Sequence, residues 1–347
     1  MSPGVQLEPL GRFAGVRILA WNGGDLYAGR GYELLRWRPG EGDWQPFASF
    51  EAKRWRRFSS AHRLSARLFR DGYHALVVLP NGSLIVALPG VIGCLPAGTC
   101  RVEASFRVPR GARPLALAAT PSGHVFWGEY FDNPRRDAVH LYGSADSGRS
   151  WQIVYSFPPG SIRHVHSITY DPHGECLWVL TGDEGRECRI LRATLDWSTV
   201  TTVVADNQQA RAVSLVPLPE AVYFATDTPM EQNFIYRLWR DGRLECLAPI
   251  ASSGFWSCRV GRAVFFSTAV EPSQVNRDVY ATLYGSADME HWAACLRWQR
   301  DAWPSRFFQY ANILLPSGDN ATNVLAVTGL AVRSQDQATH LWRVLTE

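Results

Sequence analysis

The stretch YGSADSGRSW occupies residues 142–151, and the stretch YGSADMEHW occupies residues 284–292. The same five residues therefore occur twice, and a tryptophan follows each copy at a similar distance. A short Ser/Asp/Gly segment that ends in an aromatic residue is typical of a tight turn between two strands. The sequence thus predicts a hairpin unit that recurs along the chain.

These turns belong to a longer repeat of apolar runs and turns. A short apolar run, a turn rich in Pro, Gly or Asn, and another apolar run recur seven times, and the second run begins at Leu26, Leu84, Val125, Leu177, Val222, Val264 and Val324. The spacing averages about 50 residues, which suits a blade of three or four strands. We therefore predict an all-β fold, a seven-bladed β-propeller. A pair of β-sandwiches is the alternative, but it would not require a regular period.

The composition limits the class of protein. Of the 347 residues, 46% are apolar and 19% are charged, as in a globular chain, and the net charge of +3 is too small to indicate nucleic-acid binding. No apolar run reaches the roughly 18 residues of a membrane span, and the first residues do not resemble a signal peptide. We expect one domain over residues 1–347, a cytoplasmic location, and neither a membrane span nor a nucleic-acid partner.

The first turn resembles the Asp-box, or BNR repeat, of the sialidase-like β-propeller family. Ser144, Asp146, Gly148 and Trp151 match all four positions of its S-x-D-x-G-x-x-W pattern. The second copy keeps the three residues Ser286, Asp288 and Trp292, but it is one residue shorter and lacks the glycine. The resemblance implies a propeller often associated with carbohydrate, with the turn between the third and fourth strands of a blade. All seven residues are expected to have structural roles, because their side chains cap and cover the turn.

Candidate site residues recur at equivalent positions of the repeat. Counting back about eight residues from the first turn of a unit gives His74, His166, Arg211 and Tyr310. The run Arg163-His164-Val165-His166 places alternate residues on one face of a strand. The second strand of four consecutive units is followed by an acid, in turn Glu129, Asp183, Asp227 and Glu271. In a propeller both positions face the mouth of the central channel, where ligands bind.

This set suits an acidic oligosaccharide or another anionic small molecule. Arg163, His164 and Arg211 are predicted to bind the ligand, and the catalytic candidates for a lyase or a glycosidase are His166, His74, Tyr310, Glu129, Asp183, Asp227 and Glu271. Alternatively, the charged residues form a salt-bridged plug, and the chain is a non-catalytic sugar-binding or protein-interaction scaffold. We expect no cofactor, although His164-x-His166 with an added carboxylate is an arrangement that suits a divalent metal ion.

A basic insertion precedes His74. Residues 50–72 carry seven basic side chains against Glu51 and Asp71. The segment is predicted to be either a solvated basic loop, with a short helix as one form of it, or a lid or wall that attracts an anionic ligand.

Overall fold

The computed structural model describes residues 5–345, which are predominantly β-strands. The chain divides into two compact units. Unit 1 comprises the chain up to Tyr73, the segment Pro229–Tyr236 and the chain from Cys246 onward. Unit 2 comprises His74–Thr228 and Arg237–Glu245.

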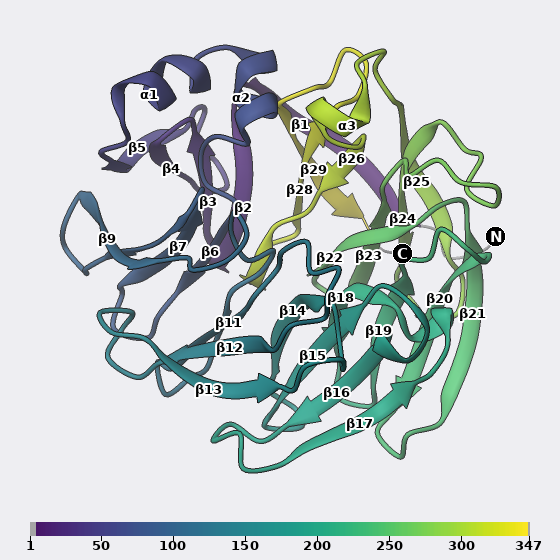
Figure 1. Ribbon diagram of the computed structural model, residues 1–347. Coiled ribbons are helices and arrows are strands. Elements are labelled where there is room, and N and C mark those ends of the chain that lie inside the picture. The colour runs from purple at the N-terminus through teal and green to yellow at the C-terminus, as the bar shows by residue number, and fades with distance from the viewer. Residues whose placement is uncertain (1–4, 346–347) are drawn as a thin grey trace. The chain divides into compact units, whose positions relative to one another are not determined.

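Unit 2 consists of successive antiparallel sheets, each built from strands adjacent in sequence (Figure 1). The first contains β6 (Ala75–Val78), β7 (Leu84–Leu88), β8 (Val91–Leu95) and β9 (Arg101–Arg107). The second contains β10 (Ala118–Ala119), β11 (Val125–Gly128), β12 (Val139–Ser144) and β13 (Gln152–Phe157). The third contains β14 (His164–Asp171), β15 (Cys176–Gly182), β16 (Arg189–Ala193) and β17 (Val200–Ala205). A fourth sheet has the order β18 (Ala212–Pro217), β19 (Ala221–Thr226), β20 (Asn233–Trp239) and β21 (Leu244–Ile250); β18 and β19 belong to unit 2, whereas β20 and β21 each have residues in both units.

Unit 1 contains further sheets of the same kind. One has β2 (Arg17–Gly23), β3 (Asp25–Arg30), β4 (Glu33–Trp37) and β5 (Gln45–Phe50) in sequence order, and β27 (Ser317–Asn320) adds to β2 in parallel. Another has β22 (Gly254–Val260), β23 (Ala263–Thr268), β24 (Tyr280–Ser286) and β25 (Ala293–Gln299). The segment around residues 315–320, which the sequence predicts to be a plain turn, therefore forms an edge strand.

The two ends of the described chain share one sheet of unit 1. Its order is β1 (Gln6–Ala14), β29 (Ala338–Leu345), β28 (Val324–Leu330) and β26 (Asn312–Leu314). β1 and β29 are antiparallel, and Gln6 lies opposite Leu345. The sequence predicts that HLWRVL, residues 340–345, meets an N-terminal strand near residues 16–18. The partner strand instead lies nearer the N-terminus, because residues 17–23 form β2.

Apolar side chains from facing sheets form the cores of both units. In unit 2, Ile85 and Ile92 of one sheet pack with the fully buried Trp127 of the next. In unit 1, Phe265 and Leu283 pack with Leu325. The strand formed by the second apolar run of a repeat is buried on both faces, which explains why that run is nearly continuous.

The basic insertion forms two short helices of unit 1, α1 (Arg54–Ser60) and α2 (Arg63–Phe69), which lie next to each other (Figure 1). Arg56 forms an ion pair with the buried Asp71 at 2.6 Å. Arg67 is completely buried and contacts Asp301 and Asp336, as well as the backbone of Phe308 at the end of α3 (Ser305–Phe308). Arg56 therefore stabilises the insertion internally, and Arg67 binds it to the rest of unit 1, so the insertion is a folded helical part of that unit.

Both YGSAD segments close a hairpin between the third and fourth strands of a sheet. In the first, Asp146 accepts hydrogen bonds from the Ser144 hydroxyl and from the N–H groups of Arg149 and Ser150, while Ser144 Oγ accepts one from the Gly148 N–H. Gly148 has φ +79°, a conformation that glycine adopts without strain. In the second, Asp288 accepts from the N–H groups of Glu290 and His291.

Replacing Asp146 with alanine is expected to lower the free energy of unfolding by about 1–2 kcal/mol, because two turn N–H groups lose their acceptor. Burial opposes ionisation of this exposed carboxylate, but hydrogen bonds from Ser150 and Ser144 and the turn amides lower its pKa to about 2. The stabilisation is therefore present above the unfolded-state pKa of about 3.9, and it disappears as the pH falls toward 2. Urea unfolding between pH 7 and pH 2 measures the difference. The variant Arg149→Ala, which keeps the backbone donor, is the control, and an equal loss in both variants would refute the assigned role.

Candidate functional site

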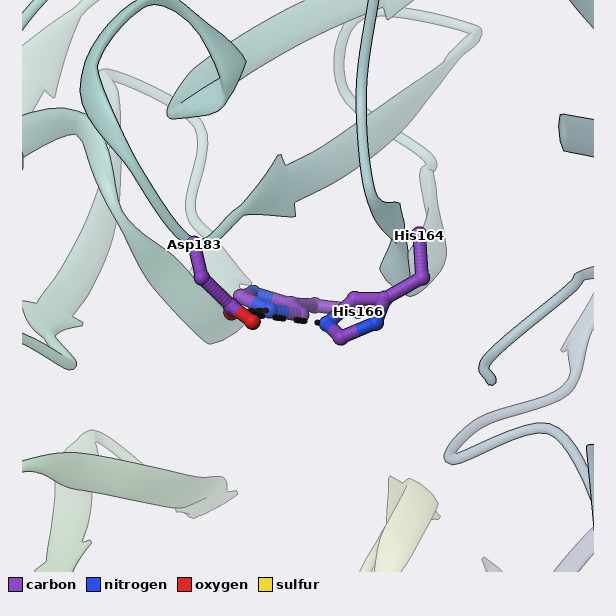
Figure 2. Close-up of side chains that lie close together, drawn as sticks. All are labelled: His164, His166 and Asp183. Carbon is purple, nitrogen blue, oxygen red and sulfur yellow. Dashed lines mark hydrogen bonds and ion pairs between the residues drawn. The ribbon is translucent and has the colours of Figure 1, made fainter. Parts of the chain in front are cut away.

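Two histidines and an aspartate meet at one edge of the β14–β15 hairpin in unit 2. His164 and His166 are the first and third residues of β14, and Asp183 directly follows β15. The two strands are antiparallel, and His164 lies opposite Gly182, so the start of β14 and the end of β15 coincide. Figure 2 shows the three side chains pointing toward one another. Asp183 Oδ1 lies 3.1 Å from His166 Nε2 and 3.4 Å from His164 Nε2.

Glycine at position 182 makes room for this arrangement. A Cβ atom at Gly182 would lie 2.7 Å from Cε1 of His166 and 3.3 Å from Cγ of Arg211. Any larger residue would therefore displace the imidazole. The sequence motif LTGD thus supplies both the acid and the space for its partner.

The outer nitrogen of each imidazole contacts a backbone carbonyl. His166 Nδ1 lies 2.7 Å from the Ala212 carbonyl, and His164 Nδ1 lies 3.0 Å from the Phe131 carbonyl. A carbonyl oxygen only accepts hydrogen bonds, so both Nδ1 atoms carry the proton. Nε2 of each ring then faces Asp183. Burial lowers the pKa of His166, which favours the neutral ring, and the hydrogen bond with Asp183 opposes this effect.

Asp183 also lies near two guanidinium groups. Arg211 Nη2 is 3.4 Å from Oδ1, and Arg163 Nη1 is 3.5 Å from Oδ2. Burial alone would raise the pKa of Asp183, but the adjacent His164 and His166 side chains hold it well below its usual range. Asp183 is therefore an ionised group near neutral pH.

Arg211 is bound on two sides. It follows a short 3₁₀ turn, η2 (Gln208–Ala210), and its Nε donates to Asp227 Oδ2 at 3.2 Å. Its Nη1 donates to the backbone carbonyl of Asp183, also at 3.2 Å. Both Arg211 and Asp227 are buried. This arginine thus connects the start of β18 with the ends of β15 and β19.

Arg163 differs from Arg211 because its partner is on the surface. Its side chain is 28% exposed and lies 2.5 Å from Asp132 Oδ1, whose own side chain is 77% exposed. The hydrogen bond that Arg163 donates to Asp132 raises the pKa of Arg163, and burial opposes that shift. The guanidinium of Arg163 therefore lies between the half-buried Asp183 and the exposed Asp132.

Two residues of this site do not follow from the repeat pattern. The Tyr130 ring lies 4.3 Å from the His164 ring, centroid to centroid, and burial, followed by the nearby carboxylates of Asp183 and Asp227, raises its pKa to about 12. The second residue that the repeat pattern does not predict is Asp132, which contacts Arg163. Both lie in the segment EYFDNP, directly after the predicted acid Glu129. An aromatic and acidic loop at the end of a strand is the signal that could have indicated them.

The structure brings together Arg163, His164, His166, Asp183, Arg211 and Asp227 of the predicted site residues. Glu129 is fully buried, and its carboxylate instead accepts from both Arg110 and the N–H of His140. His74 is buried just before β6, where its N–H donates to the Ala87 carbonyl. Tyr310 and Glu271 belong to unit 1, where Tyr310 is exposed and Glu271 accepts from the Ser253 hydroxyl.

No protein-family model matches the chain, and no curated protein matches its sequence. Solved structures do match its fold. The WD40 β-propeller domain of Doa1 aligns with a TM-score of 0.58 and 10% identity, over 98% of this chain and 97% of that one. A chain of the mitotic checkpoint complex aligns with a TM-score of 0.59 and 12% identity, over 98% and 95%.

The GH74 enzyme of Niastella koreensis aligns with a TM-score of 0.53 and 15% identity, over 83% of this chain and 46% of that enzyme. These similarities show that the chain has a β-propeller fold. Within residues 5–345, no helix has the length and apolar character needed to cross a membrane.

Proposed function

We propose that the chain is a single seven-bladed β-propeller of the Asp-box type that recognises an acidic saccharide. The two Asp-box turns and the likeness to a GH74 enzyme support the carbohydrate assignment. The observation that carries the proposal is the half-buried Arg163 with its exposed partner Asp132, beside the His164–His166–Asp183 cluster. An arginine whose partner is a surface acid can exchange that acid for the carboxylate of a ligand.

The exchange is energetically reasonable. An exposed ion pair contributes only about 0–1 kcal/mol, so separating Asp132 from Arg163 costs little. A ligand carboxylate would gain a charge-assisted, two-pronged hydrogen bond with the planar guanidinium. Asp183 and Tyr130 would border the bound sugar, because Asp183 lies 3.5 Å from Arg163 and Tyr130 packs on His164. In this proposal Arg163 binds the carboxylate of the saccharide, and the loop 130–132 moves to make room for it.

The reaction to assay first is β-elimination next to a uronate carboxylate. Glycoside hydrolysis needs one carboxyl group that donates a proton and a second that stays ionised. Asp183 stays ionised, and Glu129 is held by Arg110 within the protein interior. Elimination instead needs positive charge at the substrate carboxylate, where negative charge builds up while a base takes the proton of the neighbouring carbon, and a proton for the leaving oxygen. Arg163 is placed to supply the charge, and His166 is the candidate base, whose acquired proton then passes to the leaving oxygen. Absorbance of the unsaturated product measures this reaction.

A non-catalytic scaffold is the second candidate function. It is favoured by the internal pairing of Arg211 with Asp227 and by the likeness to a WD40 propeller domain. A chain that binds no saccharide, and whose stability depends on these ion pairs, would fit that candidate.

Opposite effects are expected from the variants Arg163→Ala and Asp132→Asn. A hydrogen bond to a charged group contributes about 1.5–3 kcal/mol, so Arg163→Ala should weaken binding of a uronate oligosaccharide by a factor of about 10 to 100. Asp132→Asn removes the competing acid and should strengthen binding about 2- to 5-fold. Isothermal titration calorimetry with charged and neutral oligosaccharides of equal length measures both effects. Arg135→Ala, an exposed arginine of the same loop, is the control, and unchanged affinity in both test variants would rule out this site.

A further inference from the structure

We propose that His164, His166 and Asp183 bind a divalent transition-metal ion, with Zn²⁺ as the first probe. This inference goes beyond saccharide recognition and does not depend on it. Two imidazole nitrogens and one carboxylate oxygen form a common ligand set for such ions, which leaves further positions open for water or substrate.

The distances between the ligand atoms fit one ion. Ligands about 2.0–2.2 Å from a tetrahedral ion lie roughly 3.3–3.6 Å from one another. His166 Nε2 and His164 Nε2 lie 3.1 and 3.4 Å from Asp183 Oδ1, and all three atoms lie within 4.8 Å of one another. The ion therefore requires only a small approach of the two rings.

The hydrogen bonds around the cluster orient the three ligand atoms toward one another. Each Nδ1–H donates to a backbone carbonyl, so Nε2 of each ring faces the Asp183 carboxylate and is the nitrogen placed to bind an ion. Among the residues that the structure describes, Nε2 of His164 is a buried atom without a hydrogen-bond partner. A cation at the centre would bind all three, and the carbonyls would hold both rings in the required tautomer.

The two arginines bind the Asp183 carboxylate only weakly, so they do not exclude a cation from it. Their distances to the Asp183 carboxylate, 3.4 and 3.5 Å, exceed the roughly 2.7–2.9 Å of a strong charged hydrogen bond. Each has a nearer acidic partner, Asp227 for Arg211 and Asp132 for Arg163. The Asp183 carboxylate thus lies beside both Nε2 atoms, and these three ligand atoms together suit a cation.

The test uses tag-free protein, stripped with a chelator and titrated with Zn²⁺ in the absence of any saccharide. We expect one ion per chain and a higher melting temperature with excess ion. His164→Ala and Asp183→Asn should weaken binding more than about 100-fold, since changes around a metal site already cost about 10- to 100-fold. His173→Ala removes an exposed histidine of the same unit and should leave binding unchanged.

Co²⁺ gives a second readout in case a variant folds poorly. A tetrahedral nitrogen and oxygen site should give visible absorption bands in the wild-type protein, and these bands should disappear on adding Zn²⁺. Zn²⁺ uptake that persists in His164→Ala would indicate other ligands, such as the exposed Cys100 and Cys246, and would overturn the proposal. Absence of uptake by the wild-type protein would overturn it as well. Neither result bears on saccharide binding by Arg163, which the calorimetric titration tests separately.

Discussion

Replacing Arg67 with alanine is expected to lower the free energy of unfolding by about 3–5 kcal/mol. The guanidinium is completely buried and lies 2.5 Å from Asp301 and 3.1 Å from Asp336. It also donates twice to the carbonyl of Phe308. Without it, Asp336 remains as a buried carboxylate that has lost its closest counterion, and burial already raises the pKa of that group.

Arg63 provides a matched control for this change. It approaches the same Asp336 at 3.4 Å, but its side chain is 52% exposed, so Arg63→Ala should cost at most about 1 kcal/mol. Urea unfolding at pH 7 compares the two variants. The Arg67 variant should regain part of its loss on acidification, because a carboxyl group with a raised pKa destabilises the fold only while it is ionised. That recovery should extend from the raised folded-state pKa down to the unfolded value of about 3.9. Similar losses in both variants would mean that Arg67 is not essential to the insertion.

The variant Arg211→Ala is expected to cost about 3–5 kcal/mol as well, whereas Arg163→Ala should cost less than about 1 kcal/mol. Arg211 bonds the buried Asp227 and the backbone of Asp183, so its loss leaves a buried acid without this partner. Arg163 is paired with a surface acid. The two variants therefore separate an arginine that holds the fold from one that is available to a ligand.

Thermal and urea unfolding of both variants, together with the saccharide titration, measure this difference. If the Arg211→Ala protein is stable but no longer binds the saccharide, Arg211 belongs to the ligand site, as the sequence predicts. A large loss of stability would instead assign Arg211 to the support of Asp183. In that case the positive charge for ligand recognition would come from Arg163.

The strand pattern could be predicted well because it depends on local rules. Each of the seven second apolar runs, from Leu26 to Val324, begins at the first or second residue of a strand, because burial on both faces requires continuous apolar sequence. The antiparallel pairing also explains why a residue at the start of one strand, His164, meets the acid after the next, Asp183.

The partners of the acids could not be predicted in the same way. Asp183, Asp227 and Glu129 occupy equivalent positions in the repeat, yet each has different partners. Glu129 is bonded by Arg110 and Asp227 by Arg211, whereas Asp183 faces two histidines. Arg110 and Asp132 lie in irregular loops, and side-chain geometry decides which residues they contact. Neither position therefore follows from strand periodicity.

The pairing of β1 with β29 has a mechanical consequence. Gln6 lies opposite Leu345, and the pairs continue to Ala14 opposite Ala338, so both ends of the described chain leave the sheet at the same end of the strand pair. A force that pulls these ends apart loads the hydrogen bonds one pair at a time, as in opening a zipper, and does not shear them all together. In single-molecule stretching between residues 6 and 345, β1 should therefore peel away first and at low force.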